Sequence, residues 1–199
     1  SDVCSSDLKW LVQGISKWLL KIYKNKTVLN YDDEIFLYGI EVIATSLFNV
    51  LLLLFIGIIS GTVNQALVYY VSYATLRKFI GGYHCNTNFN CITFNVSKYI
   101  LFIWLYPHVE INKLLMISII IITLILIIWG APFEHKNRPI SENERYKYKK
   151  YSFIITSIYA VFILLSSEFY HVLLYVLIVI DLSSIPCIIE SNGKSFKNV

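Results

Sequence analysis

Charged residues are scarce in this 199-residue chain. Only 15% of its residues are Asp, Glu, Lys or Arg, whereas 56% are hydrophobic and the mean hydropathy is +0.61. Soluble globular domains carry about 25% charged residues, so this composition excludes an ordinary soluble domain. The chain also lacks a P-loop, a GxGxxG fingerprint, a GxSxG elbow and an HExxH pair. Those enzyme classes therefore have no support in the sequence.

Long apolar runs are what the chain has instead. Two of them, residues 35–60 and 114–131, approach or exceed the ~20 residues that cross a ~30 Å hydrocarbon core as a helix. Four further candidate segments cover residues 63–80, 94–110, 151–167 and 170–188, and the first two of these four are weaker than the rest because they carry more polar residues. We expect an all-α integral membrane protein, a single membrane domain over residues 1–199, with about six transmembrane helices in a bundle at 35–188.

The few charges are unevenly placed along the chain. If the N-terminus is inside, every Lys and Arg except Lys113 falls on the cytoplasmic side. This positive-inside pattern places both termini and residues 77–91 in the cytoplasm of a multi-pass plasma-membrane protein. Membrane sidedness thus explains the net charge of +4, and we expect no nucleic-acid partner. Cytosolic thiols stay reduced, so Cys85 and Cys91 are expected to be free or catalytic rather than disulfide-bonded.

The N-terminal residues are expected to lie outside the bundle. Residues 8–24 have apolar side chains at helical spacing with lysines opposite, the pattern of an amphipathic helix. Such an interfacial helix lies on an anionic inner leaflet, or it packs against the spans, and the sequence leaves both open. Residues 1–7, SDVCSSD, fit neither pattern and are expected to be disordered or extraneous.

Residues 132–150 are predicted to be a cytoplasmic basic loop. Ser141 and Glu144 have the spacing of a capping box, which predicts a helix that starts there and runs into the fifth span. Four cations on it form a basic band: Arg145, Lys147, Lys149 and Lys150. The band either fixes topology and contacts membrane lipid headgroups or docks an acidic peptide.

Two acids, Glu41 and Asp181, interrupt the first and last spans. A carboxylate at membrane depth is costly and usually faces the bundle interior with a partner. Both lie toward the cytoplasmic ends of their spans, so either is a candidate orienting acid for residues 77–91. Helix pairing or snorkelling is the alternative explanation.

Residues 77–91, RKFIGGYHCNTNFNC, have the composition of a thiol catalytic site. A cysteine attacks as the thiolate, and an imidazole within about 2.6–3.2 Å takes its proton. In a continuous helix His84 and Cys91 would be roughly 10 Å apart, and adjacent His84 and Cys85 would not face each other. Gly81 and Gly82 permit a break in the helix. The residues that follow His84 include four that favour turns, Asn86, Thr87, Asn88 and Asn90. The chain is therefore predicted to fold back after His84.

The residues alone favour Cys91 over Cys85 as the nucleophile. They also leave open that the cysteines and His84 have only a structural role. Buried cysteines often act as small hydrophobes, and an interfacial histidine is often only hydrogen bonded. A zinc site of His84, Cys85 and Cys91 is disfavoured because the spacing resembles no usual ligand pattern. We therefore expect no metal and no cofactor.

Arg77, Gly82, His84 and Cys91, set between weak spans, are followed by the segment PFEHKNRPISENER. Together they resemble the accessory gene regulator protein B (AgrB) family over nearly the whole chain from about residue 8. These are membrane cysteine endopeptidases that process the autoinducing-peptide precursor of Gram-positive quorum sensing. The resemblance implies His84 as catalytic histidine, Cys91 as nucleophile and Arg77 and Gly82 as supporting positions. It also implies an AgrD-like precursor as partner and a homodimer.

By this resemblance, Cys91 would cleave off the precursor's C-terminal tail and hold the core as a thioester. An internal Cys or Ser of the precursor would then close a thiolactone or lactone ring, while the acidic tail meets the basic band. Two other functions stay open: a non-enzymatic small-peptide transporter or export partner using Glu41 and Asp181, and a structural membrane subunit.

Overall fold

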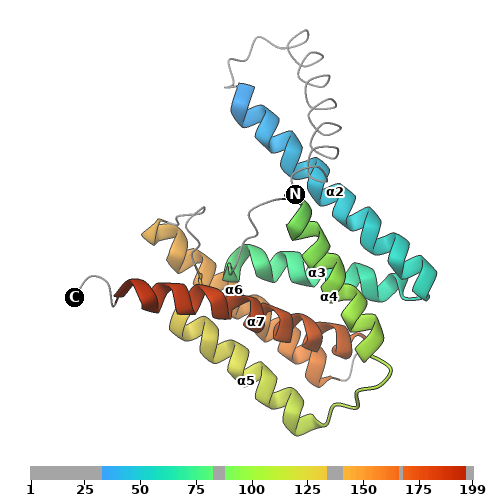
Figure 1. The fold of residues 1–199 in the computed structure, drawn as a ribbon. Helices are drawn as coiled ribbons and strands as arrows, with labels where there is room; N and C mark the ends of the chain where they lie inside the picture. The colour runs from blue at the N-terminus through green and yellow to red at the C-terminus, as the bar shows by residue number, and fades with distance from the viewer. Residues whose placement is uncertain (1–32, 83–87, 134–140, 166–167, 196–199) are drawn as a thin grey trace. The chain divides into compact units, whose positions relative to one another are not determined.

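The computed structural model describes residues 33–82, 88–133, 141–165 and 168–195 (Figure 1). Within these ranges the chain forms helices and no β-strand: α2 (Asp33–Ser60), α3 (Val63–Ile80), α4 (Asn88–Leu105), α5 (Lys113–Gly130), α6 (Glu142–Leu164) and α7 (Tyr170–Ser195). The predicted all-α class is confirmed for this part of the chain. The predicted amphipathic helix at 8–24 and residues 1–7 lie outside the described residues.

Among the helices of the described ranges, three are long and apolar enough to cross a membrane. They are Val42–Ser60 within α2, Lys113–Gly130, which is α5, and Tyr170–Ile189 within α7. The other three carry more polar residues: α3 has Arg77 and Lys78 in its last turn, and α6 begins with a charged segment. Helices of this length and composition are those of a membrane protein. Six crossings remain a prediction.

The contacts divide the chain into two compact units. The first comprises residues 1–55 and 85–97, and the second comprises residues 56–84 and 98–199. The described part of the first unit consists of α2 up to Phe55 and α4 up to Ser97. Its portion of α2 exposes several large apolar side chains, among them Val42, Ile43, Leu47, Phe48 and Leu51.

α7 is the central helix of the second unit. It packs against α3, α5 and α6, and α6 packs in turn against α3 and α5 (Figure 1). Successive side chains of α7 are buried around its circumference: Val172, Leu173, Leu174, Val176, Leu177, Val179 and Ile180. A helix that is apolar on every side is expected to be enclosed by others. The core of this unit therefore surrounds α7.

α5 shows the opposite pattern, because it buries a single stripe. Its buried residues are spaced three or four apart, as one helix face requires: Met116, Ile120, Thr123 and Ile127. Most isoleucines and leucines of its other faces are exposed, namely Leu114, Leu115, Ile117, Ile121, Ile122, Ile125 and Ile128. An exposed apolar surface of this extent suits contact with lipid hydrocarbon.

α6 begins where the capping box predicted. The Glu144 carboxylate accepts hydrogen bonds from the Ser141 backbone N–H (3.2 Å) and from the Ser141 hydroxyl (2.9 Å). The helix then runs without interruption to Leu164. The prediction that one helix starts at Ser141 and continues into the fifth apolar segment is confirmed.

Candidate functional site

The helix that precedes the predicted motif ends in two glycines. α3 stops at Ile80, and Gly81 and Gly82 have φ angles of +80° and +111°. Residues with a Cβ avoid such angles, so glycine at both positions lets the chain leave the helix. α4 begins only at Asn88. The prediction that residues 81–91 do not form one straight helix is confirmed at the two glycines.

The first glycine pairs with the segment that follows α5. Gly81 and Phe133 form an isolated parallel β-bridge. The Phe133 N–H donates to the Ile80 carbonyl (2.8 Å), and the Gly82 N–H donates to the Phe133 carbonyl (3.2 Å). A Cβ at residue 81 would collide with the Phe133 carbonyl oxygen, so this close backbone approach requires glycine. The beginning of the predicted basic loop is thereby joined to the end of α3.

Arg77, in the last turn of α3, holds the same junction through its side chain. Its Nη1 donates to the Gly81 carbonyl (2.6 Å) and to the Ser183 hydroxyl of α7 (3.5 Å). A Cβ on Gly82 would collide with this guanidinium and come within 3.1 Å of the Ser183 carbonyl oxygen. The structure thus brings Arg77 and Gly82 together. Ser183 and Phe133 were missed because nothing in the sequence links them to residues 77–91.

Cys91, the predicted nucleophile, is the fourth residue of α4 and a free, exposed thiol. The prediction that Asn88 and Asn90 belong to a turn is wrong, because α4 already starts at Asn88. Asn is favoured around helix N-termini as well as in turns, since its short polar side chain bonds the local backbone. His84 and Cys85 lie outside the described residues. The pairing of His84 with Cys91 stays a prediction.

The predicted basic band lies on the first turns of α6. Arg145, Lys147 and Lys150 are exposed. Lys149 is half-buried, and its ammonium donates to the Ile128 carbonyl of α5 (2.5 Å). Ile128 is in the last turn of α5, where carbonyls lack helical partners and a cation is favoured. Lys149 therefore ties α6 to α5, and the other three residues make up the exposed band.

Asp181 joins α7 to α5. Its half-buried carboxylate accepts a hydrogen bond from the Thr123 hydroxyl (2.8 Å). This contact favours the helix-pairing explanation of Asp181, because a membrane-depth carboxylate needs a donor. Glu41 lies within α2, and its side chain is not among those described. A role of either acid in orienting the motif stays a prediction.

An aromatic cluster between α3, α4 and α7 was not predicted. The ring of fully buried Tyr69 has its centroid 5.2 Å from that of Tyr99 and 6.3 Å from that of Tyr175. The Lys98 ammonium donates to the Tyr73 hydroxyl (3.0 Å), and the Tyr175 hydroxyl donates to the Lys98 carbonyl (2.7 Å). Lys98 therefore belongs to this cluster. Aromatic residues four apart on α3 were the available signal.

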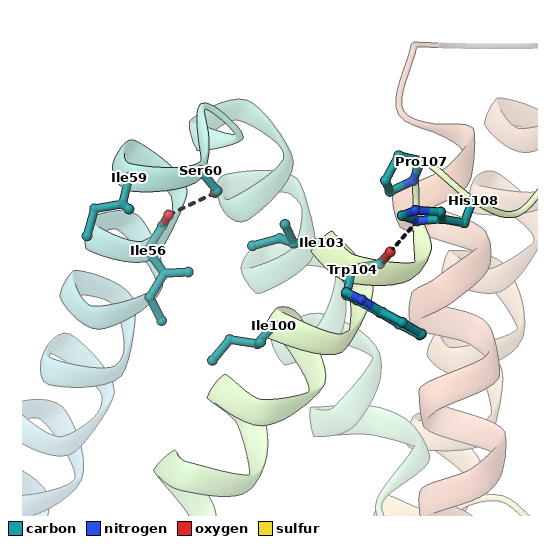
Figure 2. A pocket seen from close by; sticks show the side chains of 8 residues that line it. All are labelled: Ile56, Ile59, Ser60, Ile100, Ile103, Trp104, Pro107 and His108. Atoms are coloured by element: carbon teal, nitrogen blue, oxygen red, sulfur yellow. Dashed lines mark hydrogen bonds between the residues drawn. The ribbon is translucent and has the colours of Figure 1, made fainter.

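An apolar groove lies between the end of α2 and the end of α4 in the second unit (Figure 2). Its apolar walls are Ile56, Ile59, Ile100, Ile103, Trp104 and Pro107. The Ser60 hydroxyl donates to the Ile56 carbonyl (2.8 Å), and His108 Nδ1 donates to the Trp104 carbonyl (2.9 Å). Ser60 is thus bonded within α2, and His108, which follows α4, is bonded to the last turn of α4. None of the predicted site residues lines this groove.

Comparisons with known proteins agree on one family. The model of the family described as Accessory gene regulator B matches residues 15–188. The accessory gene regulator protein B of Staphylococcus haemolyticus is 29% identical over 130 residues, which cover 65% of this chain and 69% of that protein. Putative AgrB-like protein 2 of Clostridium perfringens is 26% identical over 172 residues, covering 81% and 79%. No solved structure matches this chain. Because the family match spans most of its length, the chain belongs to the accessory gene regulator B family.

Proposed function

We propose that this protein is a membrane cysteine endopeptidase that removes the C-terminal tail of a quorum-sensing precursor peptide and cyclises the remaining core. The observation that carries the proposal is Cys91, an exposed free thiol at the nucleophile position of the family motif. It lies in the first turn of α4, where the helix dipole favours an anion such as a thiolate. Family membership supports a role in accessory gene regulation.

The proposed reaction has two acyl transfers. The Cys91 sulfur attacks the carbonyl carbon of the scissile peptide bond while His84 takes the thiol proton. The C–N bond breaks, His84 protonates the departing amine of the tail, and the core remains as a thioester on Cys91. A thiol or hydroxyl within the core then attacks that carbonyl. Its proton returns to Cys91, which leaves as the free thiol, and the core closes into a thiolactone or lactone.

The second transfer explains why a thioester enzyme suits this task. Exchange of one thioester for another keeps the acyl group activated, whereas hydrolysis would discard that activation. The site must therefore exclude bulk water while it admits a tethered nucleophile, and a location at the membrane surface serves this need. We place the site, both termini and the 132–150 segment on the cytoplasmic side of a six-span plasma-membrane protein that forms a homodimer.

The exposed basic residues of α6 are proposed to hold the acidic tail of the precursor. Arg145, Lys147 and Lys150 face solvent within two turns, so they present a concentrated positive surface. Lys149 contributes less, because it is half-buried and its ammonium points to the Ile128 carbonyl of α5. The amphipathic start of the precursor would lie on the inner leaflet beside this band.

The test is cleavage of the precursor by single variants of the full chain in lipid vesicles. The precursor is the peptide encoded by a short neighbouring reading frame with an amphipathic start, a Cys or Ser core and an acidic tail. We expect Cys91→Ala and His84→Ala to abolish release of the tail and Cys85→Ala to retain it. Tail release by Cys91→Ala would refute the proposal. Peptide flux across the vesicle that survives Cys91→Ala would instead indicate a transporter.

A further inference from the structure

The junction after α3 holds one side chain whose role neither the motif nor the proposed reaction assigns. Ser183 of α7 is buried, with 9% of its surface exposed. Its hydroxyl donates to the Ile180 carbonyl (2.9 Å) and accepts from Arg77 Nη1 (3.5 Å). A hydroxyl has one proton and two lone pairs, so donation to α7 turns its lone pairs toward the guanidinium. Ser183 is therefore a fixed acceptor for Arg77.

The adjacent serine shows that this contact is specific to one position. Ser184 is also buried, and its hydroxyl donates to the same Ile180 carbonyl at the same distance, 2.9 Å. The guanidinium contact belongs to Ser183. The two serines thus share helix, burial and backbone partner, and they differ in the bond to Arg77.

The Ser183 contact lies directly beside the two glycines. The same Arg77 Nη1 that approaches the Ser183 hydroxyl donates to the Gly81 carbonyl at 2.6 Å. The same guanidinium and the Ser183 carbonyl oxygen close off the space beside Gly82 on two sides. Phe133 holds the other edge through the Gly82 N–H bond of 3.2 Å. Three separate parts of the chain, α3, the segment after α5 and α7, converge on this point.

We propose that Ser183 is a positioning residue that acts through Arg77 to set the path of the chain toward His84. The inference rests on the proposed thiol chemistry of His84 and Cys91. His84 follows Gly82 by two residues, which span at most about 7 Å, so we expect a shift of the junction to change where the chain can place His84. Proton transfer needs heavy atoms within about 2.6–3.2 Å, so a small displacement weakens it strongly.

The experiment measures the rate at which iodoacetamide alkylates Cys91 at pH 7 in the full chain in lipid nanodiscs. Peptide-level mass spectrometry separates Cys91 from the other cysteines, and labelling of buried Cys187 reports any loss of fold. We expect His84→Ala to slow alkylation of Cys91 by about 10-fold or more, because the thiol loses its base. Ser183→Ala should slow it by about 3- to 10-fold, and matched Ser184→Ala should not. Ser183→Thr, which keeps the hydroxyl, should restore most of the rate.

The double variant separates positioning of His84 from a general structural effect. In the His84→Ala background, Ser183→Ala should cause no further loss, because its influence passes through the imidazole. Equal rates for Ser183→Ala and Ser184→Ala beside a slow His84→Ala would overturn this inference and leave the proposed function intact. Additive losses, or labelling of Cys187 in Ser183→Ala, would also overturn it. An unchanged rate for His84→Ala would remove both the inference and the thiol–imidazole pair on which it rests.

Discussion

Replacing Gly81 by alanine should destabilise the protein much more than the same change at Gly61. Both glycines have positive φ, +80° at Gly81 and +70° at Gly61, so both substitutions meet the same intrinsic backbone penalty. That penalty is about 1 kcal/mol for a residue with a Cβ. No heavy atom outside its chain neighbours lies within 4 Å of a Cβ at Gly61, whereas at Gly81 it would strike the Phe133 carbonyl oxygen. Gly61→Ala is therefore a matched control, because it carries the backbone penalty without the collision with Phe133.

The extra cost at Gly81 follows from the bonds that Phe133 makes. If the Phe133 backbone moves away, the bonds Phe133 N–H to Ile80 carbonyl and Gly82 N–H to Phe133 carbonyl are lost. Each such hydrogen bond contributes about 1 kcal/mol, so Gly81→Ala should cost about 3 kcal/mol in total. A change of 1 kcal/mol shifts the Tm of a chain of this length by about 2–4 °C. We therefore expect a Tm lower by about 9 °C for Gly81→Ala and about 3 °C for Gly61→Ala.

The assay is thermal unfolding of the two variants and the parent protein in the same detergent, followed by intrinsic tryptophan fluorescence. Equal Tm losses for Gly81→Ala and Gly61→Ala would refute the pairing of Gly81 with Phe133. A larger loss at Gly61 would do the same.

Two further predictions use the same thermal assay. Lys149→Met should lower stability by about 1 kcal/mol, because the Ile128 carbonyl loses its cation, while exposed Lys150→Met should stay within about 0.5 kcal/mol; equal effects would argue against the tie between α6 and α5. Thr123→Val should cost about 2 kcal/mol by removing the donor to the Asp181 carboxylate, and Thr123→Ser should retain most of the stability. A Val variant as stable as the Ser variant would contradict the role assigned to this hydrogen bond.

Local sequence signals located the helices and the break in the motif. The Ser141 and Glu144 pair acts within one turn, so its spacing alone was enough to place the start of α6. Gly81 and Gly82 similarly predicted a change of backbone direction, because only glycine adopts positive φ angles freely. Asn88 and Asn90 gave a wrong prediction of a turn. Their short polar side chains bond the local backbone, which favours asparagine both in turns and in the first turn of a helix.

Contacts between distant segments could not be anticipated in the same way. Ser183 is one of several small polar residues near the end of an apolar run, and nothing in its neighbourhood distinguishes it from Ser184. Lys149 likewise resembled the other cations of the basic band, although its ammonium bonds the end of α5. In both cases the partner comes from another helix, and sequence spacing carries no information about which faces of two helices meet.

Composition, apolar run length and the placement of glycines determined by themselves that this is a helical membrane protein with an interrupted helix at residues 81–82. These are properties of single segments, governed by transfer to hydrocarbon and by local backbone sterics. Tertiary structure alone decided that α7 is enclosed while α5 buries one stripe, and that Arg77 meets Gly81 and Ser183. The physical reason is that burial and hydrogen-bond partners depend on which helix faces pack together, and that choice is made by the whole bundle at once.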